Sequence, residues 1–349
     1  MLFGTSSDEG TPMIKLVLSD MDGTLLPKGG EHVSYRTIKA IRALLDAGVR
    51  FAPATGRQAY ELDQRFFGAR ECYQTAITAN GKRVFVDGEL RREILVERSV
   101  LERLYGLLAD VPNTFLVVET AENWGGTRPW YCVGARAGDA EWFGRNVGFL
   151  AEACDELPDE DAISAEIACA GSDEQYEAIL DQARQLVPEC DFATSQVHWA
   201  DVMPRGINKG YGLKVLLDEL GLSSDEALFF GDADNDLPLM ELIPDSVAVA
   251  NATPAAAGAA RWHVGDVADD GVAEALEELA MACRQDRTPA FMQGDWQPPT
   301  CDDADAYGDE TREDLASAMF QQLLAAHLGP ELGGEAGATG GAGGDAAQL

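Results

Sequence analysis

Two carboxylates two positions apart raise the first chemical question. The stretch LVLSDMDGTLL, residues 16–26, ends an apolar run with Asp20 and Asp22 and then turns through Gly23. Two like charges about 4 Å apart repel by roughly 4 kcal/mol at an effective dielectric near 20. We therefore expect a compensating group beside this pair, and the residues elsewhere in the chain indicate which kind.

Three further groups of polar residues stand where apolar runs end or helical runs begin. They are Thr55 to Arg57, Lys209 and the stretch GDADND at 231–236. In open α/β sheets ligands bind beyond the carboxyl ends of the strands. The spacing therefore predicts that all four groups meet at one edge of a sheet.

The chemistry of these side chains favours a magnesium site. Carboxylates from two strands, Asp20 and Asp232, need a cation between them, and ligand sets made only of oxygen select a hard ion. Mg²⁺ keeps several waters and binds a substrate phosphate as well. Thr55, through its hydroxyl and backbone, and Lys209, at a helix start behind Asn208, can bind phosphate oxygens. The pattern predicts phosphoryl chemistry.

Alternating short apolar runs and helical stretches predict the elements that position these residues. Ser34 is expected to cap a helix at 35–47, and Gly48 to end it. The turn Asn80-Gly81 is expected to close the third strand. The other predicted elements are strands at 15–20, 49–55, 76–80, 227–232 and 246–251 and a helix at 210–220.

The fold class predicted is α/β, a doubly wound parallel-sheet core with an inserted α+β domain and a partly disordered acidic C-terminal tail. Residues 83–200 differ in texture from their flanks, with aromatics such as Trp124 and Trp130. The predicted parts are an extension at 1–12 ahead of Met13, a core at 13–82 and 201–285, the insertion at 83–200, and a tail at 286–349 with one amphipathic helix at 311–328.

The charge and composition of the chain argue against several classes of partner and site. A formal net charge of -34 repels nucleic acids and anionic membranes, so neither is an expected partner. The chain has no run of 18 apolar residues and no basic, apolar leader at its start, which predicts a cytoplasmic protein. Seven cysteines without CxxC pairs predict neither a zinc site nor a disulfide framework. Nothing indicates an oligomer.

At this point the motifs resemble a known family. DMDGT, the isolated Thr55, the isolated Lys209 and GDADND follow, in order, the four motifs of haloacid dehalogenase (HAD) superfamily phosphatases. The stretches at 77–81, 203–210 and 247–253 are similar to those of the Cof-type members, which carry a large α/β cap. The resemblance covers about 13–285. Asp201 departs from it, because many relatives are expected to have Glu there.

The resemblance implies roles for the site residues. Asp20 is implied as the nucleophile that forms an aspartyl-phosphate, and Asp22 as the general acid and then base, with its backbone carbonyl on the metal. The implied metal ligands are Asp20, Asp22, Asp232 and Asp236, the last being either a ligand or a group that holds water and Lys209. The implied phosphate-binding residues are Thr55, Gly56, Lys209 and Asn235. Asn80 and Gly81 form either a simple type I′ turn or, with Arg57, a border of the substrate near the hinge.

The function expected is a magnesium-dependent phosphomonoester hydrolase for small phosphorylated metabolites, with sugar phosphates as the leading class. A sugar phosphomutase of the same superfamily is one alternative, and activation by a hexose bisphosphate would identify it. A receiver-like, phospho-accepting signalling module is another, although it needs neither the second carboxylate of Asp22 nor a large insertion. A catalytically idle binding module is a third, although every expected catalytic side chain is present.

Overall fold

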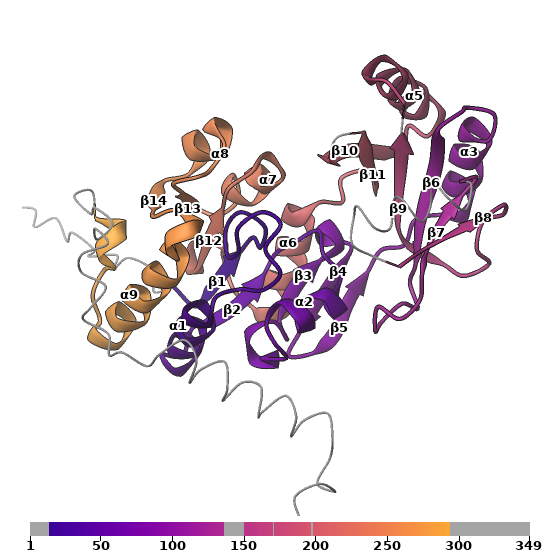
Figure 1. The fold of residues 1–349 in the computed structure, drawn as a ribbon. Coiled ribbons are helices and arrows are strands. Elements are labelled where there is room, and N and C mark those ends of the chain that lie inside the picture. Colours follow the sequence, from indigo (N-terminus) through magenta and orange to yellow (C-terminus); the bar gives the residue numbers. More distant parts are fainter. Residues whose placement is uncertain (1–13, 136–149, 170, 197, 294–349) are drawn as a thin grey trace, which may run out of the picture. The chain divides into compact units, whose positions relative to one another are not determined.

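A five-stranded parallel sheet forms the centre of the main domain (Figure 1). The computed structural model describes residues 14–135, 150–169, 171–196 and 198–293. The strand order is β14-β13-β12-β1-β2, and each adjacent pair is parallel. The strands are β1 (Leu16–Ser19), β2 (Arg50–Pro53), β12 (Ala227–Gly231), β13 (Asp245–Val249) and β14 (Trp262–Val264). The predicted doubly wound α/β core is confirmed.

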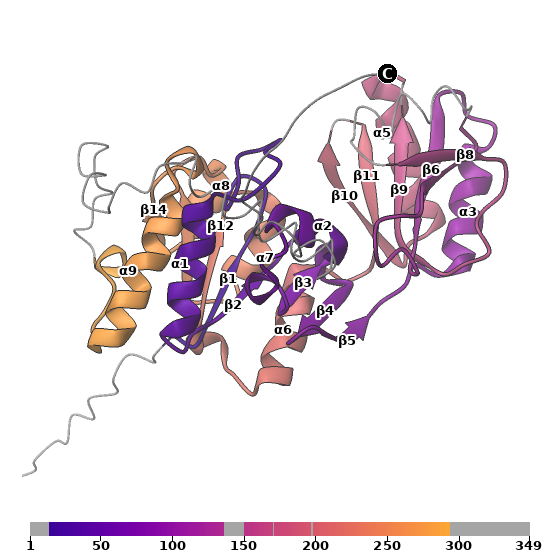
Figure 2. The same ribbon diagram turned by 60° about the horizontal axis from the view of Figure 1, so that its bottom comes forward.

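Helices cover both faces of this sheet. On one face α1 (Tyr35–Asp46) and α9 (Gly271–Gln285) lie side by side (Figures 1 and 2). On the other face lie α6 (Lys209–Leu220), α7 (Leu237–Met240) and α8 (Pro254–Ala259). Ser34 caps α1, since its Oγ accepts a hydrogen bond from Thr37 N at 3.0 Å. Covered on both sides, β1 is buried along its whole length, as a central parallel strand requires.

A small antiparallel sheet extends this core beyond β2. It consists of β3 (Ala76–Thr78), β4 (Arg83–Val86) and β5 (Glu89–Glu93), and a parallel bridge between Ala54 and Ile77 joins it to β2. Val84 and Val86 pack in the same apolar cluster as Leu213 of α6. The helix α2 (Ala59–Arg65) connects β2 to this sheet. Short 3₁₀ turns lie at Arg70–Cys72, Ala79–Gly81, Ser224–Glu226, Asp234–Asp236, Val267–Asp269 and Ala290–Met292.

A second, six-stranded sheet with order β10-β11-β9-β6-β7-β8 lies between the two halves of the core in sequence. All of its pairs are antiparallel except β7 with β8. Helices α3 (Arg98–Leu108) and α5 (Asp173–Leu186) pack on one face, where Leu116 and Ile167 contribute to the apolar cluster. The strands are β6 (Thr114–Thr120), β7 (Trp130–Val133), β8 (Ala151–Cys154), β9 (Ala162–Cys169), β10 (Cys190–Gln196) and β11 (Trp199–Pro204).

The structure moves three of the expected domain boundaries. A boundary at 83 separates β3 from β4, its hairpin partner, and a boundary at 201 cuts β11. A boundary at 286 excludes Phe291, which is buried with its ring 6.2 Å from that of Phe230 in the core. Paired strands share hydrogen bonds and packed rings share a core, so the insertion runs from the loop after β5 to the end of β11. The expected extension at 1–12 and the helix at 311–328 lie outside the described residues.

None of the described helices combines the length and the apolar character that crossing a bilayer requires.

Candidate active site

A buried ion-pair network lies where β1 and β12 end. Asp20 follows β1, and its backbone N–H donates to the carbonyl of Phe230 on β12 at 2.9 Å. Lys209 Nζ lies 2.5 Å from Asp20 Oδ1 and 2.7 Å from Asp236 Oδ1. The other carboxylate oxygen of Asp236 accepts from the backbone N–H of Asp232 at 3.0 Å. One ammonium group therefore joins residues that lie up to 216 positions apart.

Three carboxylates converge beside this network. Ligand oxygens of Asp20, Asp232 and Asp236 lie within 4.8 Å of one another, and all three residues are buried. The Thr24 hydroxyl donates to Asp232 Oδ1 at 3.1 Å. Asp232 Oδ2 is buried and accepts no well-directed hydrogen bond from the described residues, although Lys28 Nζ, on a largely exposed side chain, lies 3.2 Å away. Asp232 Oδ2 therefore has room for a further positive partner besides the exposed Lys28.

Gly23 lets the first loop approach this cluster closely. Its φ is +95°, and a Cβ built there would stand 2.4 Å from Asp232 Oδ2. A side chain at this position would occupy the space beside the carboxylates. The loop is also tied to the far side of the sheet, because Asn251 Nδ2 donates to the Gly23 carbonyl at 2.7 Å.

The electrostatics of the cluster favour a bound cation. Burial raises the pKa of Asp20 to about 8, against the opposing attraction of Lys209. Burial also raises the pKa of Asp232, against Lys28. Burial works to lower the pKa of Lys209, but Asp20 and Asp236 outweigh it and raise that pKa. Buried carboxylates in excess of buried ammonium groups, all offering oxygen, fit a hard divalent ion.

Asp22 points to a different partner. Arg57 donates from Nε to Asp22 Oδ2 at 2.7 Å and from Nη2 to Asp22 Oδ1 at 2.6 Å. Arg57 also pairs with Glu61 at 2.8 Å. The side chain of Asp22 is therefore held by a bidentate contact and does not join the three clustered carboxylates.

The β3–β4 hairpin braces the segment after β2. Thr55 is buried, and its carbonyl accepts from the backbone N–H of Asn80 at 3.0 Å. Asn80 has φ 55° and ψ 36°, and its side chain lies about 3.1 Å from where a Cβ of Gly56 would stand. The Thr55–Gly56 segment and the Asn80-Gly81 turn, which are far apart in the sequence, therefore lie in contact.

The same hairpin touches the start of α6. Gly81 has φ +93°, and a Cβ there would stand 2.1 Å from the Asn208 carbonyl oxygen. Asn208 caps α6, because its side chain accepts from Tyr211 N at 3.0 Å. Only glycine allows this approach, which helps to place Lys209.

Comparison with known proteins now adds the family. The sequence pattern of haloacid dehalogenase-like hydrolases matches residues 17–276. The chain belongs to this family. The predicted resemblance to a Cof-type phosphatase is confirmed, and so is the prediction of an enzyme of the phosphatase class. Phosphatases of this superfamily generally use a divalent metal ion.

Individual relatives agree. The chain is 26% identical over 255 residues to an HMP-PP phosphatase of Citrobacter koseri, covering 69% of this chain and 86% of the relative. It is 27% identical over 256 residues to an HMP-PP phosphatase of Escherichia coli, with the same coverage. A superfamily phosphatase from Bacteroides thetaiotaomicron has the same fold, with TM-score 0.64 at 21% identity over 80% of this chain and 98% of that one. A subclass IIB sugar phosphatase aligns with TM-score 0.62 at 19% identity over 75% and 98%.

The predicted site residues of this phosphatase fall into three groups. Asp20, Asp232, Asp236 and Lys209 lie together, Asp22 lies with Arg57, and the Thr55–Gly56 segment lies with Asn80 and Gly81. Asn235 is exposed on the turn at 234–236. The sequence analysis missed Thr24, Lys28 and Asn251. Thr24 lies within DMDGT and Asn251 within VAVANAT, so the motifs contained a signal for both.

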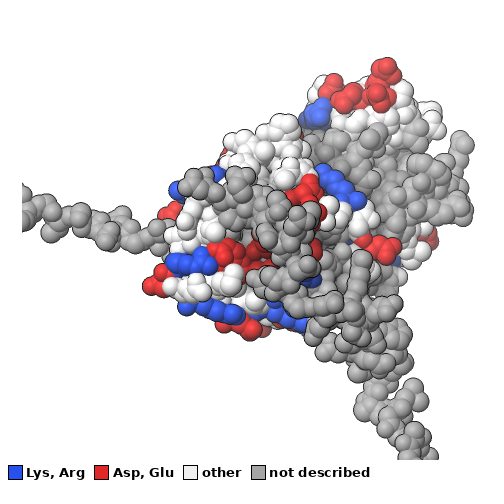
Figure 3. Space-filling model, turned by 60° about the vertical axis from the view of Figure 1, so that its left-hand side comes forward, with Lys and Arg blue, Asp and Glu red and all other residues white. Residues whose placement is uncertain are grey.

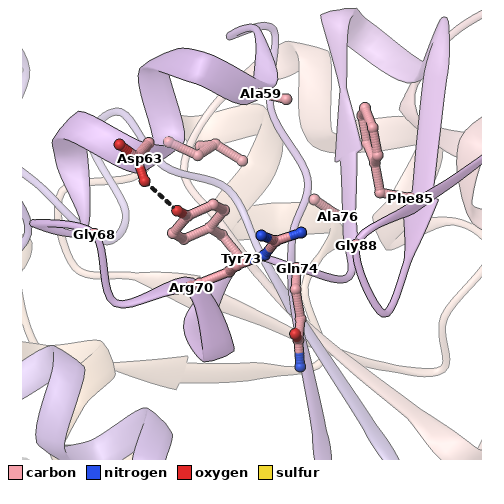
Figure 4. Close-up of a pocket in the computed structure, with 10 residues that line it drawn as sticks. Ala59, Asp63, Gly68, Arg70, Tyr73, Gln74, Ala76, Phe85 and Gly88 are labelled. Carbon is pink, nitrogen blue, oxygen red and sulfur yellow. Dashed lines mark hydrogen bonds between the residues drawn. The ribbon is translucent and has the colours of Figure 1, made fainter. Parts of the chain in front are cut away.

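A separate pocket of about 270 Å³ lies beside α2 (Figure 4). Its lining includes Ala59, Arg70, Tyr73 and Phe85, and the Tyr73 hydroxyl donates to Asp63. None of the motif residues lines it. On the face shown in Figure 3, the acidic and basic side chains of the described residues are interspersed.

Proposed function

We propose that this phosphatase is a magnesium-dependent phosphomonoester hydrolase that acts on small phosphorylated metabolites through an aspartyl-phosphate, with sugar phosphates as the leading substrate class. The convergence of Asp20, Asp232 and Asp236 with Lys209 at the strand ends carries the proposal. Such a site holds a nucleophile, a metal-binding set and a phosphate-binding cation within a few ångströms.

Asp20 is the proposed nucleophile. Its carboxylate oxygen forms a bond to phosphorus while the bond from phosphorus to the alcohol oxygen breaks, and Asp22 gives the alcohol its proton. Asp22 then takes a proton from the water that attacks the aspartyl-phosphate, which releases inorganic phosphate and restores Asp20. Both Asp22 oxygens accept from Arg57 in the structure, so Asp22 would release at least one of these hydrogen bonds in order to carry and donate the proton.

Mg²⁺ is the proposed metal, and the carboxylates of Asp20 and Asp232 and the backbone carbonyl of Asp22 would hold it. Asp236, whose oxygens accept from Lys209 and from the backbone N–H of Asp232, would be either a further ligand or the group that holds Lys209 and water. When bound, it supplies positive charge for the phosphoryl oxygens. Lys209 adds a second positive charge and pairs with both Asp20 and Asp236. The proposed phosphate contacts are Thr55, Gly56, Lys209 and Asn235.

A phosphatase assay tests the proposal. Release of phosphate from p-nitrophenyl phosphate is measured with magnesium and with a chelator, followed by a panel of sugar phosphates, nucleotides, flavin mononucleotide and HMP-PP, after which the relatives are named. We expect turnover only with a divalent ion. Asp20→Asn should abolish release while leaving the fold intact, because an amide cannot attack phosphorus. Substantial turnover by Asp20→Asn would remove this residue from the role of nucleophile.

The same panel separates the alternatives. Activation by a hexose bisphosphate would indicate a phosphomutase. A stable phospho-protein without turnover would indicate a signalling module, which has no need of the inserted six-stranded sheet. We further propose that nucleic acids and membranes are not partners, which the net charge of -34 supports, and that the enzyme works in the cytoplasm.

A further inference from the structure

The face of the six-stranded sheet opposite α3 and α5 carries buried polar residues that the proposed hydrolysis does not use. They meet two residues of the core, and we call the whole set the junction cluster. It consists of Gln58 and Lys82 from the core and Glu119, Ser164, Glu166 and Asp201 from the inserted sheet.

Strand register places the four sheet residues on one face. Glu119 lies directly opposite Ser164, and Asp201 lies directly opposite Glu166. Ser164 and Glu166 are two positions apart on β9, so their side chains share a face. The residue between them, Ala165, packs on the other face with the helices. The cluster is therefore a continuous polar row on the face opposite α3 and α5, where Tyr60 of α2 also donates to Glu119 Oε1 at 3.1 Å.

Two core side chains reach this row. Lys82 Nζ donates to Ser164 Oγ at 2.9 Å, and Gln58 Nε2 lies 3.4 Å from the same oxygen. Gln58 directly follows Arg57, which holds Asp22. Asn80, which lies against Gly56, donates to Asp201 at 3.3 Å. The junction cluster therefore begins two residues beyond the Thr55–Gly56 segment that is proposed to bind phosphate.

Three acceptor oxygens in the cluster lack partners among the described residues. They are Gln58 Oε1, Glu119 Oε2 and Glu166 Oε2, on side chains that are 2%, 1% and 4% exposed. A buried acceptor without a donor is costly, and like charges directly opposite each other in a sheet are destabilising. Such a cost is expected where a ligand supplies the missing donors.

We propose that the junction cluster binds the organic group of the substrate through its O–H or N–H donors and rejects a second anionic group. The inference rests on the proposed phosphatase function and names its substrate class. Glu119, Glu166 and Asp201 bring three carboxyl groups against the single ammonium of Lys82. A hydroxylated or amino-bearing leaving group satisfies the three acceptors, whereas a carboxylate or second phosphate adds repulsion. A bisphosphate of the kind that activates phosphomutases fits this cluster poorly.

Two matched pairs of phosphate esters test the inference. Glycerol 3-phosphate and 3-phosphoglycerate share a carbon skeleton and differ in a hydroxymethyl group against a carboxylate. Fructose 6-phosphate and fructose 1,6-bisphosphate differ in a second phosphate. Each compound is assayed for phosphate release and as a competitor of p-nitrophenyl phosphate hydrolysis, so that compounds without turnover are also ranked. We expect the member of each pair that has the phosphate as its only anionic group to be favoured by about tenfold or more.

Variants assign that preference to the cluster. Glu166→Gln should lower the preference for glycerol 3-phosphate over 3-phosphoglycerate by about tenfold, mainly through KM, because the Gln amide carries no charge and offers N–H donors to an incoming carboxylate. Glu119→Gln provides a second variant should the first fold poorly. Glu152→Gln, at an exposed position on β8 of the same sheet, is the matched control and should leave the preference unchanged.

The possible outcomes distinguish failure of this inference from failure of the proposed phosphatase function. Wild-type enzyme that hydrolyses p-nitrophenyl phosphate but prefers 3-phosphoglycerate, the bisphosphate or neither member overturns the inference and leaves the phosphatase standing. If Glu166→Gln and Glu119→Gln both leave the preference unchanged, the junction cluster is not its cause. Failure to hydrolyse p-nitrophenyl phosphate overturns both.

Discussion

The clearest test of the electrostatic argument is the substitution Lys209→Met. Methionine keeps much of the length and apolar volume of lysine but removes the ammonium group. That group lies 2.5 Å from Asp20 and 2.7 Å from Asp236, and the side chain of Lys209 is 1% exposed. The substitution therefore leaves two buried carboxylates facing each other without their shared counter-ion.

The distances set the size of the effect. At an effective dielectric near 20, each contact contributes attraction of about 6 kcal/mol. Desolvation of the three charged groups offsets most of it, and removal of one partner from a buried pair typically costs about 3–5 kcal/mol. Because a typical protein is stable by only about 5–15 kcal/mol, the loss is large enough to measure directly.

Urea unfolding in a chelating buffer measures the free energy of unfolding without bound metal. The matched control is Lys214→Met on the same helix, where the lysine is exposed. We expect Lys214→Met to change the unfolding free energy by no more than about 0.5 kcal/mol. The double variant Lys209→Met with Asp236→Asn should recover part of the loss, because one of the stranded charges is removed.

A small effect would refute this reasoning. If Lys209→Met lowers the unfolding free energy by less than about 1 kcal/mol, the penalty for stranded buried carboxylates has been misjudged. Equal losses in Lys209→Met and Lys214→Met would point to the helix rather than to the ion pairs.

Three further predictions use other features. Gly23→Ala should lower the free energy of unfolding by about 1–3 kcal/mol and weaken magnesium binding in a titration, because its Cβ would stand 2.4 Å from Asp232 Oδ2. The control is Gly29→Ala, where φ is also positive but the space is open, so only backbone strain remains. Equal effects of the two substitutions would contradict the steric argument. Burial raises the pKa of Glu119 from 4.5 to about 7, so the folded protein binds this proton more tightly than the unfolded chain does. This proton contributes roughly 3 kcal/mol of stability, which is complete below about pH 4.5 and is lost as the pH rises through about 7. Glu119→Gln should therefore flatten the pH dependence of the unfolding free energy measured between pH 5 and pH 8. An unchanged slope would contradict this prediction. Ser34→Ala should lower the unfolding free energy by about 1 kcal/mol through loss of the α1 cap, and a neutral result in chemical denaturation would show that the cap hydrogen bond contributes little.

Local signals in the sequence were sufficient for much of the fold. The helix expected at 35–47 is α1 at Tyr35–Asp46 with Ser34 as its cap, because capping and helical periodicity act over a few residues. The strands expected at 15–20 and 227–232 are β1 and β12, and their parallel pairing brings Asp20 and Asp232 to one edge. Parallel strands end together, so motif positions alone anticipated that meeting.

Other features depend on partners that the local sequence does not identify. Nothing within the segment KRVFVDG, residues 82–88, shows that β4 pairs with β3 in the core rather than with the inserted sheet. The contact between Asp22 and Arg57 requires the loop after β1 to face the loop after β2. Side-chain direction in such loops follows from packing, and a two-residue spacing does not specify it.

By itself the sequence determined five of the core strands, the helices that became α1 and α6, the family and the four groups of polar residues, because each of these follows from spacing and side-chain type. Tertiary structure alone decided that Glu119 lies opposite Ser164 and that Gln58 and Lys82 reach the same hydroxyl. The reason is register. Residues more than 40 positions apart become neighbours only when particular strands pair, and a shift by one residue would turn each side chain of the strand to the opposite face.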